Sequence, residues 1–395
     1  MKIAVIGGGA SGIVSAIYAK RINEKNSVTV FERSDRILKK LLATGNGRCN
    51  LSNTCISESN YFSSESGFTG KILSSFSPEE ERDFFSSIGI ILAEEDGRIY
   101  PYSRRASSVL DALRFECEHL GIRIRTNAFI TKVEKKNDFF IINGESFDRV
   151  IISVGSNAAP SFGTDGNGAN LLNSLGHKTE KFRYALSPVK VKESTKMLKG
   201  IRAKGNVSLY EKGRLIRTEK GEIQFTDYGL SGIAVMQLSR LCREGSTLSL
   251  DLFPELTKEE LYNMLTERKE NLSYLKAEDF LTGFLHKALA QFILTCAGIK
   301  PSISAEALTK KDISVLADFI KELSFTVTSV IGKEQSQASS GGAYLSDFNP
   351  QTLESLKCPG LYCTGELLDV VGDCGGYNLH WAWTTAYVAG NSAGK

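Results

Sequence analysis

The chain opens with two short apolar runs that flank a stretch with helical spacing of its apolar residues. The runs cover residues 2–6 and 27–31, and the helical stretch begins near residue 10. Short apolar runs bounded by turn residues are typical of buried strands, and apolar residues at three- and four-residue intervals are typical of an amphipathic helix. The pattern predicts a strand–helix–strand unit at the start of the chain.

The rest of the first half changes from a helical period to a period of two. Helical spacing covers residues 78–88 and 105–120, after which Gly121 supplies a helix stop. The alternation that follows predicts strands at 122–126, 128–135, 139–143 and 149–154. The last of these strands is apolar and ends at Gly155, and open α/β sheets bind ligands at the carboxyl ends of such buried strands.

The second half carries a β-rich part, a helical part and a return to α/β character. Short alternating runs occupy residues 188–252, interrupted by a predicted helix at 231–242, and helical spacing covers 257–323. The last sixty residues predict another strand, glycine turn and helix. A chain of 395 residues is too long to form a single ordinary hydrophobic core, so we expect several parts. We expect an α/β fold made of residues 1–187 and 325–395, with a β-rich insert at 188–254 and a helical insert at 255–324.

Composition narrows the class of protein. Hydrophobic residues make up 42% and charged residues 24%, and the net charge is +3. This balance argues against nucleic acid or an anionic membrane as the main partner, and no apolar run reaches the ~18 residues of a membrane span. Because the first strand starts at Lys2, we expect no leader and a cytoplasmic protein. Eight cysteines without a C-x-x-C pair indicate neither a metal site nor a redox dithiol.

Three glycines at G-x-G-x-x-G spacing follow the first strand. Gly7 permits the sharp turn, Gly9 lets a pyrophosphate approach the backbone, and Gly12 lets helix and strand pack closely. A helix that opens at Ala10 or Ser11 directs its free N–H groups at the phosphates. The motif therefore predicts a bound dinucleotide.

The context of the glycines supports this prediction. Glu32 ends the second strand, 20 residues after Gly12, where a carboxylate accepts from ribose hydroxyls. A glutamate there favours an adenosine ribose without a 2′-phosphate. The alternative is an ordinary β–α–β unit with a tight turn and no ligand.

The C-terminal strand and helix suit the far end of a long cofactor such as flavin adenine dinucleotide (FAD). Glu366 follows the strand and can accept from a ribityl hydroxyl, and the N–H groups near Gly376, Tyr377 and Asn378 can face the flavin N1/O2 edge. A nicotinamide enzyme would not need the C-terminal strand and helix to bind its cofactor. The alternative is a capped helix after a loop.

Four strings of residues resemble one family. The segments Thr44–Asn50, Gly221–Gly232, Gly365–Asp369 and Gly375–Trp383 are similar to those of the bacterial flavoproteins labelled NAD(P)/FAD-dependent oxidoreductase, BaiN-like, or aminoacetone oxidase family FAD-binding enzyme. The resemblance covers essentially the whole chain. It implies a Rossmann-like, glutathione-reductase-like FAD-binding domain with β-barrel-like and helical inserts.

The resemblance also implies where the cofactor lies. It assigns the N-terminal glycines and Glu32 to the ADP moiety, Glu366 to the ribityl chain, and Gly376–Leu379 to the isoalloxazine. Leu38 stands where a glycine is expected, and Ile233 replaces a frequent proline. The full expected set is Gly7, Gly9, Ala10, Ser11, Gly12, Glu32, Gly45, Asn46, Gly47, Arg48, Cys49, Gly155, Gly365, Glu366, Gly375, Gly376, Tyr377, Asn378 and Leu379.

Catalytic side chains are harder to name, because the flavin itself carries the redox chemistry. Arg48 can clamp a substrate carboxylate, although a structural role in its loop is favoured. Cys49 and Cys374 suggest a thiol relay, against which inert packing is favoured. His380 is the best-placed histidine for acid–base work, and a satisfied core histidine is the alternative. We interpret the loop at 162–168 and Ser231 as N-terminal caps of the predicted helices that follow them.

The sequence thus predicts an FAD-dependent oxidoreductase of an unidentified small molecule, with hydride transfer through flavin N5 and NAD(P)H or oxygen as the second partner. No second strand-GxGxxG-helix appears, so NAD(P)H would dock without that fingerprint. The alternatives are a nicotinamide-only dehydrogenase and a flavin-carrying, RNA-interacting protein without turnover. The near-neutral charge argues against the last.

Overall fold

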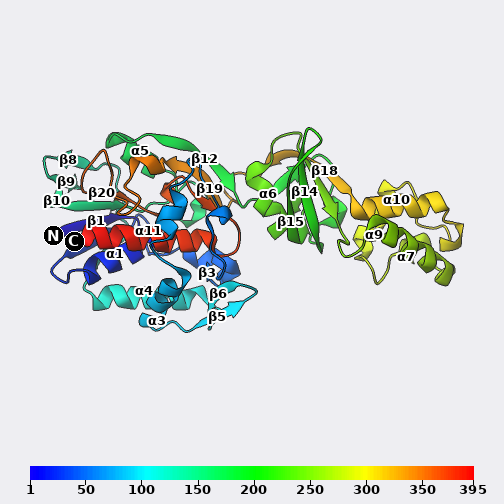
Figure 1. Ribbon diagram of the computed structural model, residues 1–395, viewed down its shortest axis with the longest axis horizontal. Helices are drawn as coiled ribbons and strands as arrows, with labels where there is room; N and C mark the ends of the chain where they lie inside the picture. Colours follow the sequence, from blue (N-terminus) through cyan, green and yellow to red (C-terminus); the bar gives the residue numbers. More distant parts are fainter. The chain divides into compact units, whose positions relative to one another are not determined.

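The computed structural model describes residues 1–395 and divides into two compact units. One unit contains Met1–Ala185 and Lys333–Lys395, and the other contains Leu186–Gly332 (Figure 1). The first unit is therefore built from both ends of the chain. The second is one continuous insertion.

A five-stranded parallel sheet forms the centre of the first unit. Its order is β20-β11-β1-β2-β7, so the chain runs outward in one direction from β1 to β2 and in the other from β1 to β11. This reversal is the switch point at which open α/β sheets bind ligands. The strands are β1 (Lys2–Ile6), β2 (Ser27–Phe31), β7 (Arg123–Arg125), β11 (Arg149–Ile152) and β20 (Leu361–Cys363). The predicted α/β, Rossmann-like fold class is confirmed.

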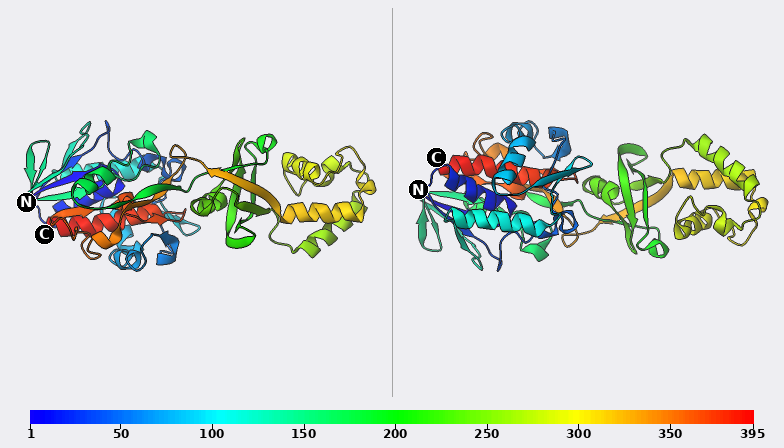
Figure 2. Two further views of the ribbon diagram at one scale, coloured as in Figure 1. Left: turned by 90° about the horizontal axis from the view of Figure 1, so that it is seen from above. Right: turned by 90° about the horizontal axis from the view of Figure 1, so that it is seen from below.

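Two helices from opposite ends of the sequence lie side by side against this sheet. They are α1 (Ala10–Arg21) and α11 (Tyr377–Gly394), the blue and red helices of Figure 2. A Cβ on Gly390 would lie 2.6 Å from the backbone oxygen of Ser15, and one on Gly394 would lie 2.0 Å from Ile22 Cγ2. Glycine at these positions is what lets the two backbones approach so closely.

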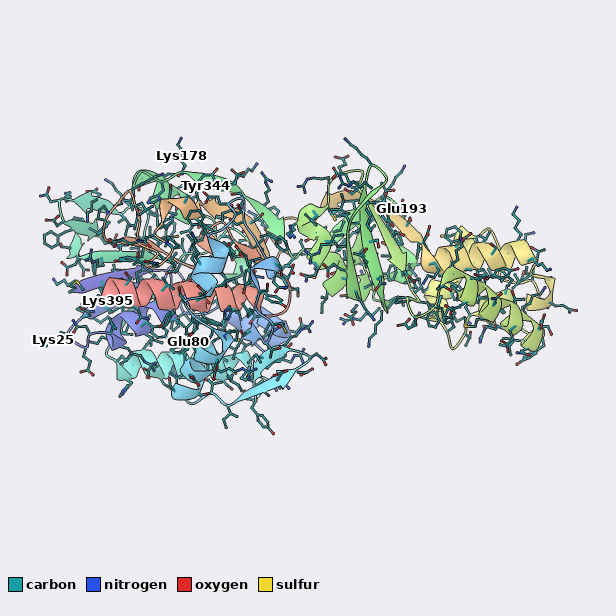
Figure 3. All side chains as sticks on the ribbon, in the orientation of Figure 1. Lys25, Glu80, Lys178, Glu193, Tyr344 and Lys395 are labelled. Carbon is teal, nitrogen blue, oxygen red and sulfur yellow. The ribbon has the colours of Figure 1, made fainter.

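Smaller elements complete the first unit. The helix α3 (Pro78–Ser87) begins with a capping box between Ser77 and Glu80, and Glu80 is labelled in Figure 3. The other elements are α2 (Thr69–Leu73), α4 (Ala106–His119), α5 (Gly168–Ser174), β3 (Ser52–Asn53), β4 (Tyr61–Phe62), β5 (Leu92–Glu95), β6 (Arg98–Pro101), β8 (Glu134–Lys136), β9 (Phe139–Ile142), β10 (Glu145–Phe147), β12 (Thr179–Ala185), β19 (Ala338–Ala343) and β21 (Val371–Gly372).

The strand expected at residues 128–135 is only partly present, since β8 starts at Glu134. Asn127 has a left-handed φ of 53°, and the Ala128 N–H donates to the carbonyl oxygen of Glu32. The segment therefore crosses the end of β2, and its alternating pattern does not become a ladder.

The second unit is a closed six-stranded barrel with helices that share its hydrophobic core. The barrel order is β13-β16-β15-β14-β17-β18. The elements are β13 (Val189–Val191), β14 (Arg202–Glu211), β15 (Arg214–Phe225), β16 (Gly229–Ser231), α6 (Ile233–Leu238), β17 (Thr247–Asp251), α7 (Lys258–Asn271), α8 (Ala277–Phe280), α9 (Lys287–Cys296), α10 (Lys310–Lys321) and β18 (Leu323–Val330). Because β18 closes the barrel, the chain re-enters the first unit at Lys333, later than the expected residue 325.

Neither loop that suggested a helix cap supplies a capping side chain. Ser231 ends β16, and the N-cap of α6 is Gly232 at a φ of 92°, where a Cβ would lie 2.4 Å from the Glu222 oxygen. The N-cap of α5 is Asn167, again without a side-chain cap.

None of the helices combines the length and apolar character that a membrane span requires.

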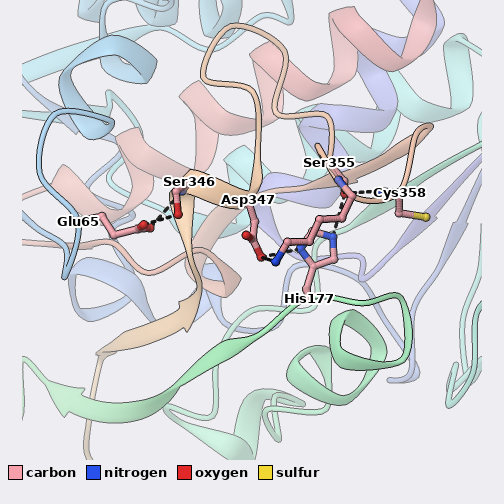
Figure 4. A network of polar contacts seen from close by, with 7 residues as sticks. Glu65, His177, Ser346, Asp347, Ser355 and Cys358 are labelled. Atoms are coloured by element: carbon pink, nitrogen blue, oxygen red, sulfur yellow. Dashed lines mark hydrogen bonds and ion pairs between the residues drawn. The ribbon is translucent and has the colours of Figure 1, made fainter.

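A network of polar contacts stabilises the loop before β20 (Figure 4). The His177 ring lies 3.1 Å from Asp347 through Nδ1 and 2.9 Å from Ser355 Oγ through Nε2. The order Ser–His–Asp resembles a hydrolase triad, but Ser355 is buried and its hydroxyl already accepts from the N–H groups of Lys357 and Cys358. The hydroxyl therefore caps a turn, and burial lowers the pKa of His177, in keeping with a neutral structural imidazole.

Substitution Gly390→Val tests the close contact of α1 and α11. The new side chain would meet the Ser15 backbone, which cannot move aside, so we expect the free energy of unfolding to fall by about 1–3 kcal/mol. This loss exceeds the gain of less than ~1 kcal/mol from removing a helical glycine. Urea denaturation followed by circular dichroism measures it. The control Asn391→Ala should stay within about 0.5 kcal/mol, and an equally small effect of Gly390→Val would contradict the packing.

Candidate functional site

The carboxyl ends of four parallel strands meet at one edge of the sheet. Register aligns Ile6 with Phe31 and Ile152, and Ile152 with Cys363, so the residues that follow each strand are neighbours. Ser153, which follows β11, and Thr364, which follows the neighbouring β20, form a hydroxyl pair at 2.7 Å. These loop residues form the candidate site.

Two of the three motif glycines are needed by the fold itself. Gly7 has a φ of 105°, and its Cβ would lie 2.4 Å from the Ser153 oxygen. A Cβ on Gly12 would lie 1.9 Å from the oxygen of Gly7. Tight turn and close packing explain both residues without any ligand.

Gly9 differs from the other two. It is the N-cap of α1 with a φ of −79° and a ψ of −172°, which any residue can adopt, and a Cβ there would meet nothing within 4 Å. Neither strain nor packing requires glycine at this position. An open backbone at the end of α1, beside the unpaired N–H groups of its first turn at Ala10 and Ser11, is the space that a phosphate group needs.

Glu32 faces the glycine turn. One carboxylate oxygen accepts from the Gly8 N–H at 2.8 Å and the other accepts from the Ser34 N–H at 2.7 Å. An ionised carboxylate has about four acceptor positions, so each oxygen retains one for a hydroxyl group. The side chain is thus oriented by the backbone and still able to bind a ribose.

The C-terminal strand brings the other end of the chain to the same place. Gly365 has a φ of 69°, and a Cβ there would lie 2.5 Å from Ser11 Oγ. Its N–H donates to Thr385 Oγ1 at 3.0 Å, and its oxygen accepts from Trp381 Nε1 at 3.1 Å. The structure therefore brings the start of α1 and the loop after β20 together.

Glu366, the next residue, is held on both sides. Oε2 lies 2.7 Å from Lys40 Nζ, and Oε1 accepts from the Ser339 N–H at 3.1 Å. The Ser339 hydroxyl is buried without a protein partner, and Gly155 lies beside the carboxylate. Lys40 and Ser339 had no signal in the sequence, because only the fold brings them to Glu366.

The loop at residues 44–50 is built from left-handed positions. Gly45, Asn46 and Cys49 have φ values of 57°, 55° and 59°, and the Cys49 N–H closes the loop on the Thr44 oxygen at 3.0 Å. Asn50 Oδ1 is buried and has no protein partner. A backbone fixed in this way presents polar groups rather than a hydrophobic surface.

Arg48 lies against its own loop. Nε donates to the Gly45 oxygen at 3.4 Å, the guanidinium lies 4.9 Å from the centre of the Tyr100 ring, and Glu95 is 3.8 Å away. All of these partners belong to the protein. The geometry favours the structural role over a substrate clamp.

The start of α11 contacts the strand that follows this loop. A Cβ on Gly376, at a φ of 103°, would lie 2.3 Å from the Ser52 oxygen, and Asn53 Nδ2 donates to the Gly375 oxygen at 3.0 Å. Asn378 bonds both the N–H and the oxygen of Gly372. These contacts hold the α11 N-terminus, with the first-turn N–H groups of Tyr377 and Leu379, next to the 44–53 segment.

Of the two candidate cysteines, Cys49 is buried and Cys374 is half-buried. Burial raises the pKa of Cys49 to about 12 and also raises the pKa of Cys374. Neither forms a disulfide. Since the thiolate is the reactive form, these surroundings favour inert packing over a thiol relay.

His380 is fully buried and paired with a residue that the sequence did not suggest. Its Nδ1 lies 2.5 Å from Glu81 Oε2 and 3.2 Å from Ser52 Oγ. Burial raises the pKa of Glu81, and the nearby His380 opposes that rise. The sequence did not single out Glu81, because it is one of several acidic residues in the first turn of α3, where acidic residues are common. A ring without exposed surface cannot exchange protons directly with a bound substrate, which favours the core role.

Comparisons with known proteins identify the family of this chain. A family model described as the HI0933-like protein Rossmann domain matches residues 1–392. The chain belongs to this family. The 3-dehydro-bile acid delta(4,6)-reductase of Clostridium scindens is 36% identical over 405 residues, covering 100% of this chain and 99% of that protein. Both matches confirm the family resemblance read from the motifs.

More distant relatives and solved structures are also similar. The ribosomal RNA dihydrouridine synthases of Haemophilus influenzae and Escherichia coli are 26% and 27% identical, over 99% and 97% of this chain and 98% and 95% of theirs. The structure of 3-ketosteroid delta1-dehydrogenase from Sterolibacterium denitrificans is 12% identical over 99% of each chain, with a TM-score of 0.46. At this identity the structural likeness concerns the fold alone.

The pH dependence of stability tests the buried Glu81–His380 pair. With a raised folded-state pKa, Glu81 keeps its proton above its ordinary value of about 4.5, so the folded chain binds more protons than the unfolded chain and stability falls as pH rises. Glu81→Gln removes this titration. From pH 4.5 to about 6, below the range of a free histidine, the variant should gain stability relative to wild type, by at most ~1.4 kcal/mol per pH unit.

Urea unfolding at a series of pH values measures this difference. The exposed Ser86→Ala on the same helix removes no titrating group, so it is the control and should show a difference that does not change with pH. A Glu81→Gln difference that is flat or of opposite slope would show that the pKa of Glu81 is not raised in the folded chain.

Proposed function

We propose that this chain binds FAD and is a flavin-dependent oxidoreductase of a small molecule. The observation that carries the proposal is the open backbone at Gly9, a glycine that neither conformation nor packing requires. It lies where four strand ends and two helix N-termini from opposite ends of the chain converge. Membership of the HI0933-like family supports the same assignment.

The residues at this edge fit such a cofactor. The N–H groups at Ala10 and Ser11 would bind the diphosphate, Glu32 the adenosine ribose, and Glu366 a ribityl hydroxyl. The α11 N-terminus would lie at the flavin edge that becomes negative on reduction, since a helix N-terminus favours negative charge. The buried polar atoms of Asn50 and Ser339 would find partners there.

The bound flavin supplies hydride acceptance and donation at N5, and the protein supplies orientation and electrostatics. This division explains why no exposed acid–base side chain stands out at the site. The related Clostridium scindens protein is named a reductase of a 3-dehydro-bile acid. We therefore propose an unsaturated ketone as the first substrate class to test, with NAD(P)H as electron donor and oxygen as the alternative partner.

The experiment begins with the purified full chain. An absorbance band near 450 nm, and FAD as the nucleotide released on denaturation, are the expected results. Anaerobic bleaching by NADH or NADPH, followed by reoxidation with unsaturated ketones, would identify the reaction. Release of NAD alone would instead support a nicotinamide-only dehydrogenase and would overturn the proposal.

Substitution Gly9→Val separates cofactor binding from folding. The new side chain has open space and an allowed backbone conformation, so the stability of the cofactor-free chain should change by less than about 1 kcal/mol. In the holoprotein it would occupy the diphosphate position, and we expect flavin affinity to fall at least tenfold. Flavin content and equilibrium unfolding measure the two effects.

Gly12→Val is the matched comparison, because its clash with the Gly7 oxygen should impair folding itself. Full flavin retention by a folded Gly9→Val variant would remove the main support for the proposed binding mode.

A second candidate substrate is a pyrimidine base within RNA. Residues 186–221 hold ten basic side chains against three acidic ones, a local excess that the net charge of the whole chain conceals. Lys190, Lys192 and Lys204 among them are exposed and make no ion pair. Such a surface suits a phosphate backbone, and two relatives are named ribosomal RNA dihydrouridine synthases.

Binding to a ribosomal RNA fragment at several salt concentrations distinguishes the two candidates. Tight binding that weakens steeply with salt, together with oxidation of the reduced flavin by that RNA, would favour the RNA substrate. Oxidation by unsaturated ketones alone would favour the small molecule.

A further inference from the structure

Lys40 is not part of the glycine motif, and the family match gives it no role. It lies near the proposed diphosphate position. The segment after β2 folds back over the glycine turn, where the Leu38 N–H donates to the Gly8 oxygen at 2.8 Å. Ile37 contacts the same turn, with Cγ2 2.8 Å from the point that a Cβ on Gly8 would occupy. Lys40 follows two residues later and so emerges beside the N-terminus of α1.

The Lys40 ammonium group reaches across this edge to the other end of the chain. Nζ lies 2.7 Å from Glu366 Oε2, and the two side chains are 29% and 21% exposed. Glu366 follows Gly365, whose Cβ would lie 2.5 Å from Ser11 Oγ in the first turn of α1. The ammonium group is therefore close to the N–H groups proposed for the phosphates.

The charges at this edge favour such a cation. Glu32 and Glu366 place two carboxylates on either side of the path of the dinucleotide, and the first turn of α1 contains no basic side chain. A helix N-terminus contributes only about half an elementary charge. A diphosphate with two negative charges would otherwise be repelled from both sides.

We propose that Lys40 is a diphosphate-binding residue of the dinucleotide site. An ammonium group has three donors, so it can keep Glu366 as one partner and donate to a phosphate oxygen with another. Leu38, at a φ of 60° where a glycine was expected, contributes to the turn that aims the lysine. The inference rests on the proposed function and names one side chain of its binding site.

The alternative is that Lys40 only neutralises Glu366. Removing Lys40 alone would leave the Glu366 carboxylate uncompensated and would repel a phosphate under either role, so the test is made in a Glu366→Gln background. ADP contains the diphosphate but no ribityl chain. Adenosine contains neither. We expect the double variant Lys40→Met/Glu366→Gln to bind ADP about 10- to 100-fold more weakly than Glu366→Gln, both as cofactor-stripped full chains, which is the range that one charge-assisted hydrogen bond supplies. Adenosine binding should agree within twofold.

Two further variants complete the calorimetric test. Lys39→Met is the matched control, since the neighbouring Lys39 pairs with Asp35 and should leave ADP affinity unchanged. Lys40→Arg retains the positive charge and should restore most of the ADP affinity. Urea unfolding of each stripped variant verifies that the fold is intact.

Equal ADP affinities of Lys40→Met/Glu366→Gln and Glu366→Gln, or a loss that extends equally to adenosine, would overturn the inference. Its failure is separable from that of the proposed function. A wild-type chain that binds ADP through Lys40 but releases no flavin would refute the flavin assignment alone. A yellow holoprotein whose stripped form binds ADP without help from Lys40 would refute only the lysine.

Discussion

The contact between the two ends of the chain is the constraint on which the candidate site depends. The loop after β20 presses Gly365 against Ser11 at the start of α1, and α11 then runs along α1 with glycine at its closest points. Each of these glycine positions excludes a side chain, because atoms of α1 lie within 3 Å of the point that its Cβ would occupy. As a result, the start of α1, the loop after β20 and the carboxyl ends of four parallel strands lie at one edge of the sheet, where open α/β sheets bind ligands.

Buried polar pairs hold the loops around that surface in place. Asp369 accepts from the Ser64 and Gly341 N–H groups, and so ties three distant segments together. Glu81 and His380 do the same for α3, α11 and the strand at Ser52. A buried ionisable pair adds little net stability, but leaving one partner alone is costly, so such pairs restrict alternative arrangements more than they stabilise the fold. We infer that they keep the site rigid while its surface stays polar.

Local patterns in the sequence were enough to predict the α/β class, the first β–α–β unit and the β-rich and helical parts, because strand and helix periods are properties of adjacent residues. The motif glycines and Glu32 could likewise be recognised from their spacing in the sequence. Lys40 at Glu366, and Glu81 at His380, were not, because these partners are 326 and 299 residues apart and meet only after the sheet has formed. The strand expected at 128–135 failed for the same reason: Ala128 bonds Glu32, and this tertiary contact overrides the local alternation.

The insertion of one unit into the other has a consequence for biosynthesis. Leu186–Gly332 is a continuous stretch that holds all six strands of its barrel and can close as soon as it leaves the ribosome. The sheet of the first unit lacks β20 and its covering helix α11 until the whole inserted unit has been translated. During that interval β11 has an unpaired edge and α1 an uncovered apolar side, which makes the unfinished first half of the chain a natural client for chaperones.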